Sequence, residues 1–437
     1  MSESPYALLN WSDRHRAPPD APPDVGPDAK PDLGPDLGPD VAPGLAKDTN
    51  RSVAATRSHC RFLFAIVHAV SLMICALTLS GALDAHAQVP NASEWPNTDF
   101  SKTLVDLDEI LSGGPPKDGI PSIDSPKFVT PRAAAEWLDN REPVIVVSMG
   151  NDVRAYPVQI VMWHEIVNDT INSVPISVTF CPLCNATIIF DRRLNDSVLD
   201  FGTTGRLRKS DLVMYDRQSE SWWQQFSGRA IVGELVGKTL ARIPGQIVAF
   251  EDFRKDHPQG KVLSRETGHL RAYGQNPYGG YDDIDQHPFL FSDPVDPRLP
   301  AMERVLNISI AGTHHLYPFS KLRKTAVVND TVADQPVVVF SLDGTLSALD
   351  ASRIKDSRTL PSATAWFRKV DGKVLDFEAR DGQIIDLQTK TQWSILGHAT
   401  QGPLTGTRLR PAPGGVHFAF AWLAFNPDSN IWQGAKP

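Results

Sequence analysis

The stretch GRAIVGELVGKTL at residues 228–240 returns further along the chain as GHATQGPLTGTRL at residues 397–409. Three glycines, one alanine and two leucines recur in the same order, each 169 residues after its counterpart. An ordered match at a fixed offset indicates an internal repeat. Glycines at fixed places in such a stretch are typical of tight connections between strands. The pattern therefore predicts two tandem homologous modules rich in β-structure.

Further matches set the limits of the two modules. They are Tyr156-Pro157 with Tyr317-Pro318, residues 167–170 (VNDT) with 328–331, residues 198–201 (VLDF) with 374–377, and Trp223 with Trp393. We assign the first module to residues 130–245 and the second module to residues 300–425. Residues that both modules keep are expected to serve the fold. Residues that only one module has are free to serve a function.

Each module is expected to consist of short antiparallel strands with about one helix, so the predicted fold class is α+β and β-rich. Runs of β-branched and aromatic residues bounded by turn residues predict the strands of the first module, at 143–149, 175–180, 187–191 and 197–201. Pro157 suits the first turn of a helix, and Asn168-Asp169 is expected to end that helix. Residues 246–299, rich in Gly, Pro and Tyr, predict a long ordered loop.

The N-terminal part of the chain lies outside the repeat. Residues 1–56 contain a Pro/Asp-rich tract with few large apolar side chains, which predicts a disordered tail. Residues 57–87 combine basic residues, an apolar run at 62–83 and the sequence Ala85-His86-Ala87, which is the order found in a secretory signal peptide. The apolar run is also long enough for an uncleaved membrane anchor.

Both interpretations place the rest of the chain outside the cytoplasm, as a periplasmic or secreted protein that the inner membrane anchors if the signal is retained. Residues 88–129 are then a linker and lead-in to the first module, and residues 426–437 are a C-terminal tail.

Charge and cysteine content exclude several classes of function. The 437 residues carry a formal net charge of −8, so a broad nucleic-acid-binding surface is not expected. Membrane contact is expected only through residues 62–83, if they are not cleaved. Four cysteines are too few for a disulfide scaffold, and cleavage before Gln88 would remove Cys60 and Cys75. Only Cys181 and Cys184 would then remain, in an oxidising compartment.

The Cys181/Cys184 pair stands in the segment VTFCPLCNATIIF, residues 178–190. Apolar runs on both sides predict a strand, a turn and a second strand. Asn185 follows the second cysteine and tolerates the left-handed backbone that such a turn often requires. Two thiolates on one tight turn between strands are typical of a metal-binding knuckle. A thioredoxin-like site would need a helix after the first cysteine, which the β-branched residues 187–190 disfavour.

Three interpretations of this pair stay open. The pair could bind a thiophilic metal, copper or zinc, as two thiolates favour. It could be the redox centre of a thiol–disulfide oxidoreductase, or it could form an inert disulfide in a structural or interaction module.

Other residues peculiar to the first module are weaker candidates. His164 and Glu165 are candidates for further metal ligands, because the second module has Thr325-Ala326 in their place. Trp222 is a candidate for the wall of a cofactor pocket, because only its neighbour Trp223 has a counterpart in the second module.

These motifs together resemble an uncharacterised family of exported bacterial and archaeal proteins, catalogued as domain of unknown function 3179. The resemblance is carried by residues 109–121 (EILSGGPPKDGIP), 155–157 (AYP), 163–169 (WHEIVND), 181–184 (CPLC), 211–217 (DLVMYDR) and 276–281 (NPYGGY). It covers about residues 104–425. The family often has glycine where this chain has Asn185. The resemblance implies export and a paired architecture, and it implies no reaction.

Overall fold

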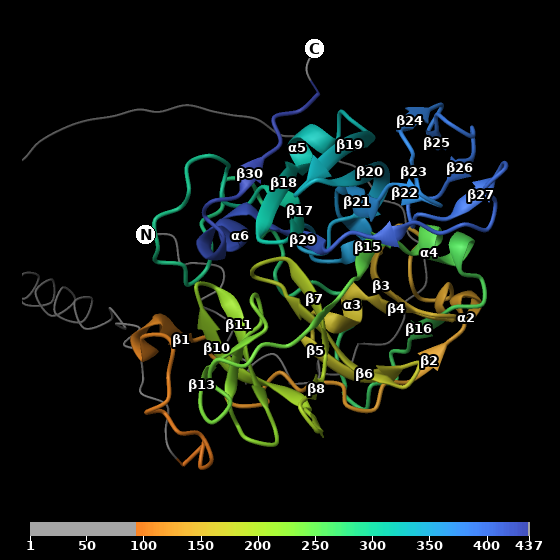
Figure 1. Ribbon diagram of the computed structural model, residues 1–437. Helices are drawn as coiled ribbons and strands as arrows, with labels where there is room; N and C mark the ends of the chain where they lie inside the picture. Colours follow the sequence, from red (N-terminus) through yellow and green to blue (C-terminus); the bar gives the residue numbers. More distant parts are fainter. Residues whose placement is uncertain (1–92, 436–437) are drawn as a thin grey trace, which may run out of the picture. The chain divides into compact units, whose positions relative to one another are not determined.

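A computed structural model describes residues 93–435, which belong to one compact unit (Figure 1). The predicted tail at 1–56 and the predicted signal or anchor at 57–87 lie outside the described residues. None of the helices found between residues 93 and 435 has the length and apolar character that crossing a membrane requires. Strands dominate the described residues, and the helices are short.

The first half of the described fold, residues 143–263 with the strands paired to it, contains three sheets. The first sheet, in spatial order, consists of β15 (Gln246–Ala249), β3 (Pro143–Met149), β4 (Asp152–Pro157), β16 (Lys261–Leu263) and β2 (Phe128–Val129). The second sheet consists of β14 (Arg242–Ile243), β7 (Ala186–Asp191), β6 (Val174–Cys181) and β5 (Ile166–Ile171). The third sheet consists of β1 (Ile110–Ser112), β10 (Phe201–Arg208), β11 (Asp211–Asp216), β12 (Trp222–Gln224) and β13 (Arg229–Val232).

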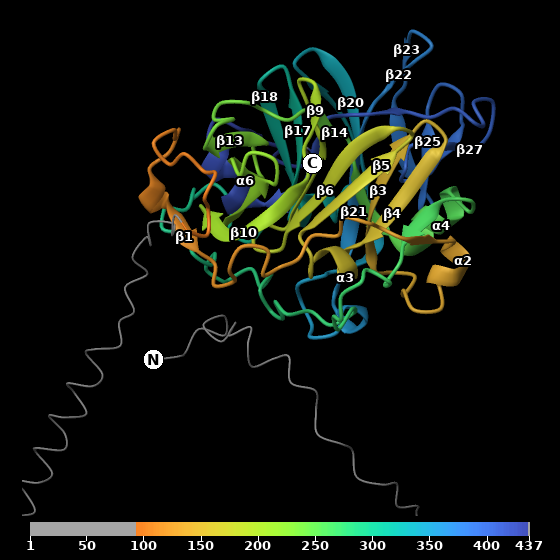
Figure 2. The same cartoon turned by 90° about the horizontal axis from the view of Figure 1, so that it is seen from below.

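Short elements complete this half. They are the hairpin of β8 (Arg193–Leu194) and β9 (Ser197–Val198), the 3-10 turn η1 (Leu107–Glu109), and the helices α2 (Pro131–Ala134), α3 (Val158–Val161) and α4 (Phe250–Asp256). Helix α3 contacts β3, β4 and β6, and Figure 2 shows it at one end of these strands.

The second half, residues 304–431, contains three further sheets. One consists of β29 (Gly414–Phe418), β17 (Arg304–Ile310), β18 (Thr313–Pro318) and β30 (Asn430–Ile431). The next consists of β19 (Val327–Val332), β20 (Gln335–Leu346), β21 (Thr359–Phe367) and β28 (Arg410–Pro411). The last consists of β24 (Phe377–Arg380), β25 (Gln383–Asp386), β26 (Gln392–Trp393) and β27 (Ala399–Gln401). The remaining elements are the hairpin of β22 (Lys369–Val370) and β23 (Lys373–Val374), η2 (Ile354–Asp356), α5 (Phe319–Leu322) and α6 (Ala419–Phe425).

The order of elements in the second half follows that of the first half. Each half runs from a hairpin through a one-turn helix to a sheet, a two-stranded hairpin and a four-strand meander, and ends with a seven-residue helix and a short strand. The registers agree as well, since Val144 pairs with Pro157 in the first half and Val305 with Pro318 in the second.

Side-chain contacts recur between the halves. The side-chain amide of Asn168 donates to the carbonyl of Phe201 at 2.8 Å and accepts from its N–H at 3.2 Å. Asn329 makes the same two hydrogen bonds with Phe377, at 2.8 and 2.9 Å. The halves are not independent, because one core cluster joins Val146 and Phe250 to Val338 and Trp366. The apolar faces of both halves are therefore buried in shared cores.

The strand predictions agree closely with the structure. The run at 143–149 is β3, and its first five residues are buried, as expected for a strand covered on both faces. The runs at 175–180 and 187–191 correspond to β6 and β7, and the run at 197–201 is divided between β9 and the first residue of β10. The β-rich fold class is confirmed.

The predicted helix after Pro157 was too long. Helix α3 ends at Val161, and Asn168-Asp169 lie inside strand β5 instead of ending a helix. Glu165 has a φ of 58°, which breaks the helical path, and the β-branched residues that follow pair with β6.

Two other expectations differ from the structure. The predicted loop at 246–299 begins with β15, α4 and β16, so only its later part lacks helices and strands. The pairing is not purely antiparallel, because β16 pairs with β4 and β30 pairs with β18 in parallel. In both halves a short helix connects two strands of the same sheet, and this crossover permits a parallel neighbour.

Candidate metal centre

Cys181 and Cys184 lie at the two ends of the tight turn that joins β6 to β7. Cys181 is the last residue of β6 and pairs with Ala186, the first residue of β7. The N–H of Asn185 donates to the carbonyl of Pro182 at 3.1 Å and closes the turn. Asn185 has a φ of 47°, which confirms the left-handed conformation expected from the sequence. A strand follows the motif, so the helix that a thioredoxin-like site requires is absent here.

Backbone contacts from distant segments fix this turn. The hydroxyl of Tyr281 donates to the carbonyl of Leu183 at 3.1 Å. The N–H of Phe418, the last residue of β29 in the second half, donates to the carbonyl of Cys184 at 2.9 Å. The second half therefore holds in place a turn whose sulfur atoms belong to the first half.

A hairpin from the third sheet approaches the same turn. Strands β10 and β11 meet at Lys209-Ser210, whose φ values of 53° and 65° fit a type I′ turn. The carbonyl of Ser210 accepts from both thiols, with Ser210 O to Sγ distances of 3.7 Å for Cys181 and 3.4 Å for Cys184. The next residue, Asp211, begins β11 and is buried.

Asp211 is held through one carboxylate oxygen. Its Oδ2 accepts from Gln224 Nε2 at 2.6 Å and from the Phe226 N–H at 2.8 Å. Its Oδ1 is buried and accepts no N–H or O–H hydrogen bond within residues 93–435, and the Cys184 thiol interacts with the carboxylate. A buried carboxylate oxygen without an N–H or O–H donor is costly in a folded protein and calls for an explanation. A cation bound between Oδ1 and the sulfur atoms would satisfy it.

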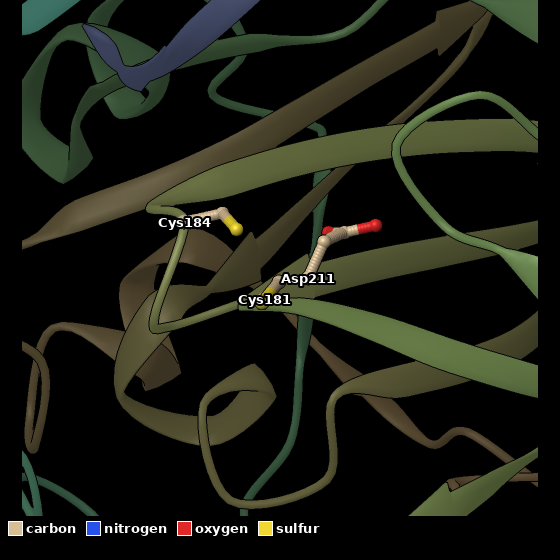
Figure 3. Close-up of side chains that lie close together, drawn as sticks. All are labelled: Cys181, Cys184 and Asp211. Carbon is tan, nitrogen blue, oxygen red and sulfur yellow. The ribbon is translucent and has the colours of Figure 1, made fainter. Parts of the chain in front are cut away.

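The two sulfurs and a carboxylate oxygen of Asp211 all lie within 4.8 Å of one another (Figure 3). Figure 3 shows Cys184 and Cys181 on the turn and Asp211 on the neighbouring strand. In a tetrahedral zinc site, ligand atoms bonded at about 2.1–2.3 Å are about 3.5–3.8 Å apart. A contraction of at most about 1.3 Å would therefore bring these three atoms to ligand positions.

Burial disfavours negative charge on Asp211 and on Cys184. It raises the pKa of Asp211 to about 7, against the opposing effect of the hydrogen bonds from Gln224 and Phe226. It also raises the pKa of Cys184 well above that of an ordinary thiol, and the neighbouring Cys181 raises it further. Without a cation, the cluster therefore holds protons that a bound metal ion would displace.

Glu165 lies close to this cluster but outside the ligand group. Its side chain is buried, and burial followed by the charge of Asp211 raises its pKa to about 8. Its φ of 58° is uncommon for a residue other than glycine. Burial raises the pKa of Tyr278, and the nearby Glu165 and Cys181 raise it further. Glu165 is therefore a buried acid beside the candidate ligands.

The structure does not bring His164 to the cysteines. Its Nδ1 donates to the carbonyl of Pro121 at 2.7 Å, and its Nε2 lies 2.7 Å from the hydroxyl of Tyr273. Burial lowers its pKa to about 4, so the ring is neutral and Nε2 accepts the tyrosine proton. Both ring nitrogens are therefore engaged, and His164 links Pro121 to Tyr273.

Trp222 also lies elsewhere. It is completely buried in a separate core cluster of the third sheet, edge-on to Trp95 and Phe100. Its neighbour Trp223 donates from Nε1 to Asp216 at 2.9 Å, and its counterpart Trp393 donates to Asp386 at 3.1 Å. Trp222 therefore lines no pocket at the cysteine cluster.

The sequence interpretation missed Asp211 as a candidate ligand. A signal was present, because the hairpin that carries Asp211 spans Phe201–Asp216 whereas its counterpart spans only Phe377–Asp386. An extension present in one module alone is the kind of feature that we expected to serve a function. Its contact with the turn at 181–184 depends on the packing of two sheets, which the sequence pattern does not contain.

Comparison with known proteins gives a family and no activity. A family model described as "Protein of unknown function (DUF3179)" matches residues 117–429, which is most of the chain. No curated protein and no solved structure matches the chain.

Proposed function

The chain belongs to this family of proteins of unknown function, and we propose that its cysteine cluster binds a thiophilic metal ion, with Cys181, Cys184 and Asp211 as ligands. The observation that supports this most directly is the convergence of two thiol sulfurs and one carboxylate oxygen of Asp211 within 4.8 Å of one another, in a buried site. Three protein ligands leave one position of a tetrahedral ion for water or another ligand.

The carboxylate favours zinc over copper. Cu(I) prefers soft sulfur donors, whereas Zn(II) accepts thiolate and carboxylate together. A set of two thiolates and one carboxylate carries three negative charges, which a divalent ion reduces to one. The raised pKa values of Asp211 and Cys184 mean that zinc must compete with protons for this site.

The burial of the thiols argues against the alternative of thiol–disulfide exchange. Exchange needs an accessible thiolate with a low pKa. Cys181 and Cys184 are 1% and 0% exposed, and the pKa of Cys184 is raised. Metal-ligating thiols tolerate such burial, because the ion keeps them deprotonated.

The proposal extends to the origin and location of the protein. We propose that the two modules arose by tandem duplication and that the second module lost, or never acquired, the metal ligands. The matched order of elements and the matched Asn168 and Asn329 contacts support this view. We also propose that the chain is exported, on the basis of the sequence at 57–87.

The test is the metal content of the full chain, exported to a bacterial periplasm, purified without chelator and measured by plasma mass spectrometry. We expect the Cys181→Ser/Cys184→Ser variant to contain about one equivalent of zinc less than the wild type. Asp211→Asn, which preserves shape, is expected to weaken zinc retention in the same direction.

Asp381→Asn is the matched control, because Asp381 occupies the exposed turn of the shorter β24–β25 hairpin. It should leave the zinc content unchanged. Equal metal content in the wild type and the double cysteine variant would refute the proposal. A redox-active or inert disulfide would then be the function to test.

A further inference from the structure

A second group of metal-binding side chains lies where the two halves meet. Asp256, the last residue of α4, and His257, which caps that helix, come from the first half. His398 comes from the second half, in the turn between β26 and β27. One potential ligand atom from each residue lies within 4.8 Å of the other two. None of these residues belongs to the cysteine cluster.

The three side chains are already oriented toward one another. His398 Nδ1 lies 3.1 Å from Asp256 Oδ2, and the ring centroids of His257 and His398 are 4.8 Å apart. The hydroxyl of Ser394 donates to Asp256 Oδ2 at 2.6 Å and fixes the carboxylate. Carboxylates that orient ligands are themselves usually fixed by such outer hydrogen bonds.

The ring of His257 is available as a ligand. It is 7% exposed and stands edge-on to the ring of His398. A metal ion held between His257, His398 and Asp256 would contact all three side chains.

The group of Asp256, His257 and His398 borders a cavity. A cavity of about 180 Å³ is lined by both histidines together with Arg408, Trp366, Leu396 and Val146, among others. The charge of Arg408 opposes a cation, and Asp256 offsets that charge. An anion or a water molecule in the cavity could contact both Arg408 and the open coordination position of the ion.

The comparison of the halves shows that this group is not a feature that the fold itself requires. The helix α6 corresponds to α4, and it ends with Phe425 and Asn426 in the places of Asp256 and His257. The position of His398 in the repeated stretch is occupied by Arg229 in the first half. The same backbone arrangement therefore forms without these ligands.

We propose that Asp256, His257 and His398 form a second metal site, specific for a divalent first-row transition ion and open to the cavity at the junction of the halves. Two imidazoles and one carboxylate suit Zn(II) and its neighbours, and three protein ligands with one open position characterise catalytic rather than structural zinc sites. This proposal does not depend on the cysteine cluster.

The test uses the full chain carrying Cys181→Ser/Cys184→Ser, freed of metal and titrated with zinc by calorimetry. We expect about one equivalent to bind. His257→Asn, which introduces the residue that the second half has at this place, should weaken binding at least about tenfold, as should His398→Gln. His287→Asn, at an exposed histidine, is the control and should bind like its parent.

Absence of zinc binding in the double cysteine variant, or binding unaffected by both histidine variants, would overturn the proposal and leave a plain His398–Asp256 hydrogen bond. If the double cysteine variant does not fold, Co(II) binding to the wild type decides the matter. The second site should then give cobalt absorption without a thiolate charge-transfer band, and His257→Asn should remove that component alone. A wild-type spectrum with thiolate-bound cobalt only would also overturn the proposal.

Discussion

The two halves differ in two matched features, the connection between two strands of one sheet and the length of a β-hairpin. In the first half, β6 and β7 are joined by the short turn at 182–185, and the long hairpin of β10 and β11 reaches it. In the second half these lengths are reversed, since β20 and β21 are joined by residues 347–358 and the β24–β25 hairpin is short. Similar arrangements of strands thus carry the cluster of Cys181, Cys184 and Asp211 in one half and a longer loop in the other.

The buried carboxylates associated with these loops show what the difference means. Asp282 Oδ2 forms ion pairs with Arg304 Nη2 at 2.7 Å and with Arg358 Nη2 at 2.9 Å. Arg358 belongs to the long loop of the second half. Burial raises the pKa of Asp282, but the two guanidinium groups outweigh it and hold the pKa below the ordinary value. Among residues 93–435, no Lys or Arg forms an ion pair with Asp211, and its pKa is raised to about 7. Asp282 is therefore compensated within the chain, whereas Asp211 is suited to an added cation.

The largest expected effect is a difference in the free energy of unfolding between variants of these two carboxylates. Asp282→Asn should lower the free energy of unfolding by about 4 kcal/mol, because it leaves the buried Arg304 without its charged partner. Asp211→Asn, measured without metal, should change that free energy by less than about 1 kcal/mol, because it replaces a group whose burial is already unfavourable. Urea unfolding of both variants makes the comparison. Equal losses would show that Asp211 is as structural as Asp282.

The next effect tests whether the repeated glycines have the same role in both halves. Gly228 and Gly397 have φ values of 68° and 70°, and a Cβ on them would lie 2.6 Å from Phe190 and 2.9 Å from Trp366. Gly228→Ala and Gly397→Ala should each cost about 3 kcal/mol, combining backbone strain with a core clash.

Gly237→Ala and Gly406→Ala are the controls for this pair. Both glycines have positive φ but open space around the position of a Cβ, so about 1 kcal/mol is expected from backbone strain alone. Thermal or urea unfolding measures all four variants. A large loss in only one half would break the structural equivalence of the two stretches.

Zinc bound at the cysteine cluster of the first half should stabilise the folded protein. At a free zinc concentration of 100 times the dissociation constant, the cysteine cluster should add about 2.7 kcal/mol to the free energy of unfolding. Cys181→Ser/Cys184→Ser should lose this contribution, and Asp381→Asn in the second half should keep it. Urea unfolding with zinc and with a chelator measures the difference. A zinc response that survives in full in the double cysteine variant would assign it elsewhere.

The last comparison concerns the residue that precedes the first strand of each half. Glu142 accepts from Gln159 Nε2 at 2.6 Å, and Glu303 accepts from the Ser320 N–H at 2.8 Å. Burial raises the pKa of Glu142 to about 7. Between about pH 4.5 and about pH 7 the unfolded chain loses this proton before the folded chain does, so stability falls as pH rises.

Glu142→Gln should remove this fall, flattening the curve by up to ~1.4 kcal/mol per pH unit. Unfolding in urea across that pH range measures the slope. An unchanged slope would show that Glu142 is ionised in the folded protein.

The cysteine turn shows how far the sequence could go. The β-branched residues on both sides of Cys-Pro-Leu-Cys predict two strands, and Asn185 predicts the left-handed turn, because these preferences act over a few residues. The helix after Pro157 was overestimated, since its apolar spacing fits a helix and a buried strand alike. Tertiary pairing of β5 with β6 decided the outcome.

The sequence by itself determined the strands of the first half, the family and the turn that carries Cys181 and Cys184, because these depend on local preferences and on order along the chain. The tertiary structure alone decided which distant groups join that pair. It placed Asp211 beside the sulfurs, tied His164 to Pro121 and Tyr273, and brought His398 to Asp256 and His257. Each of these contacts depends on how sheets and halves pack, which follows from burial of the whole apolar core rather than from any local pattern.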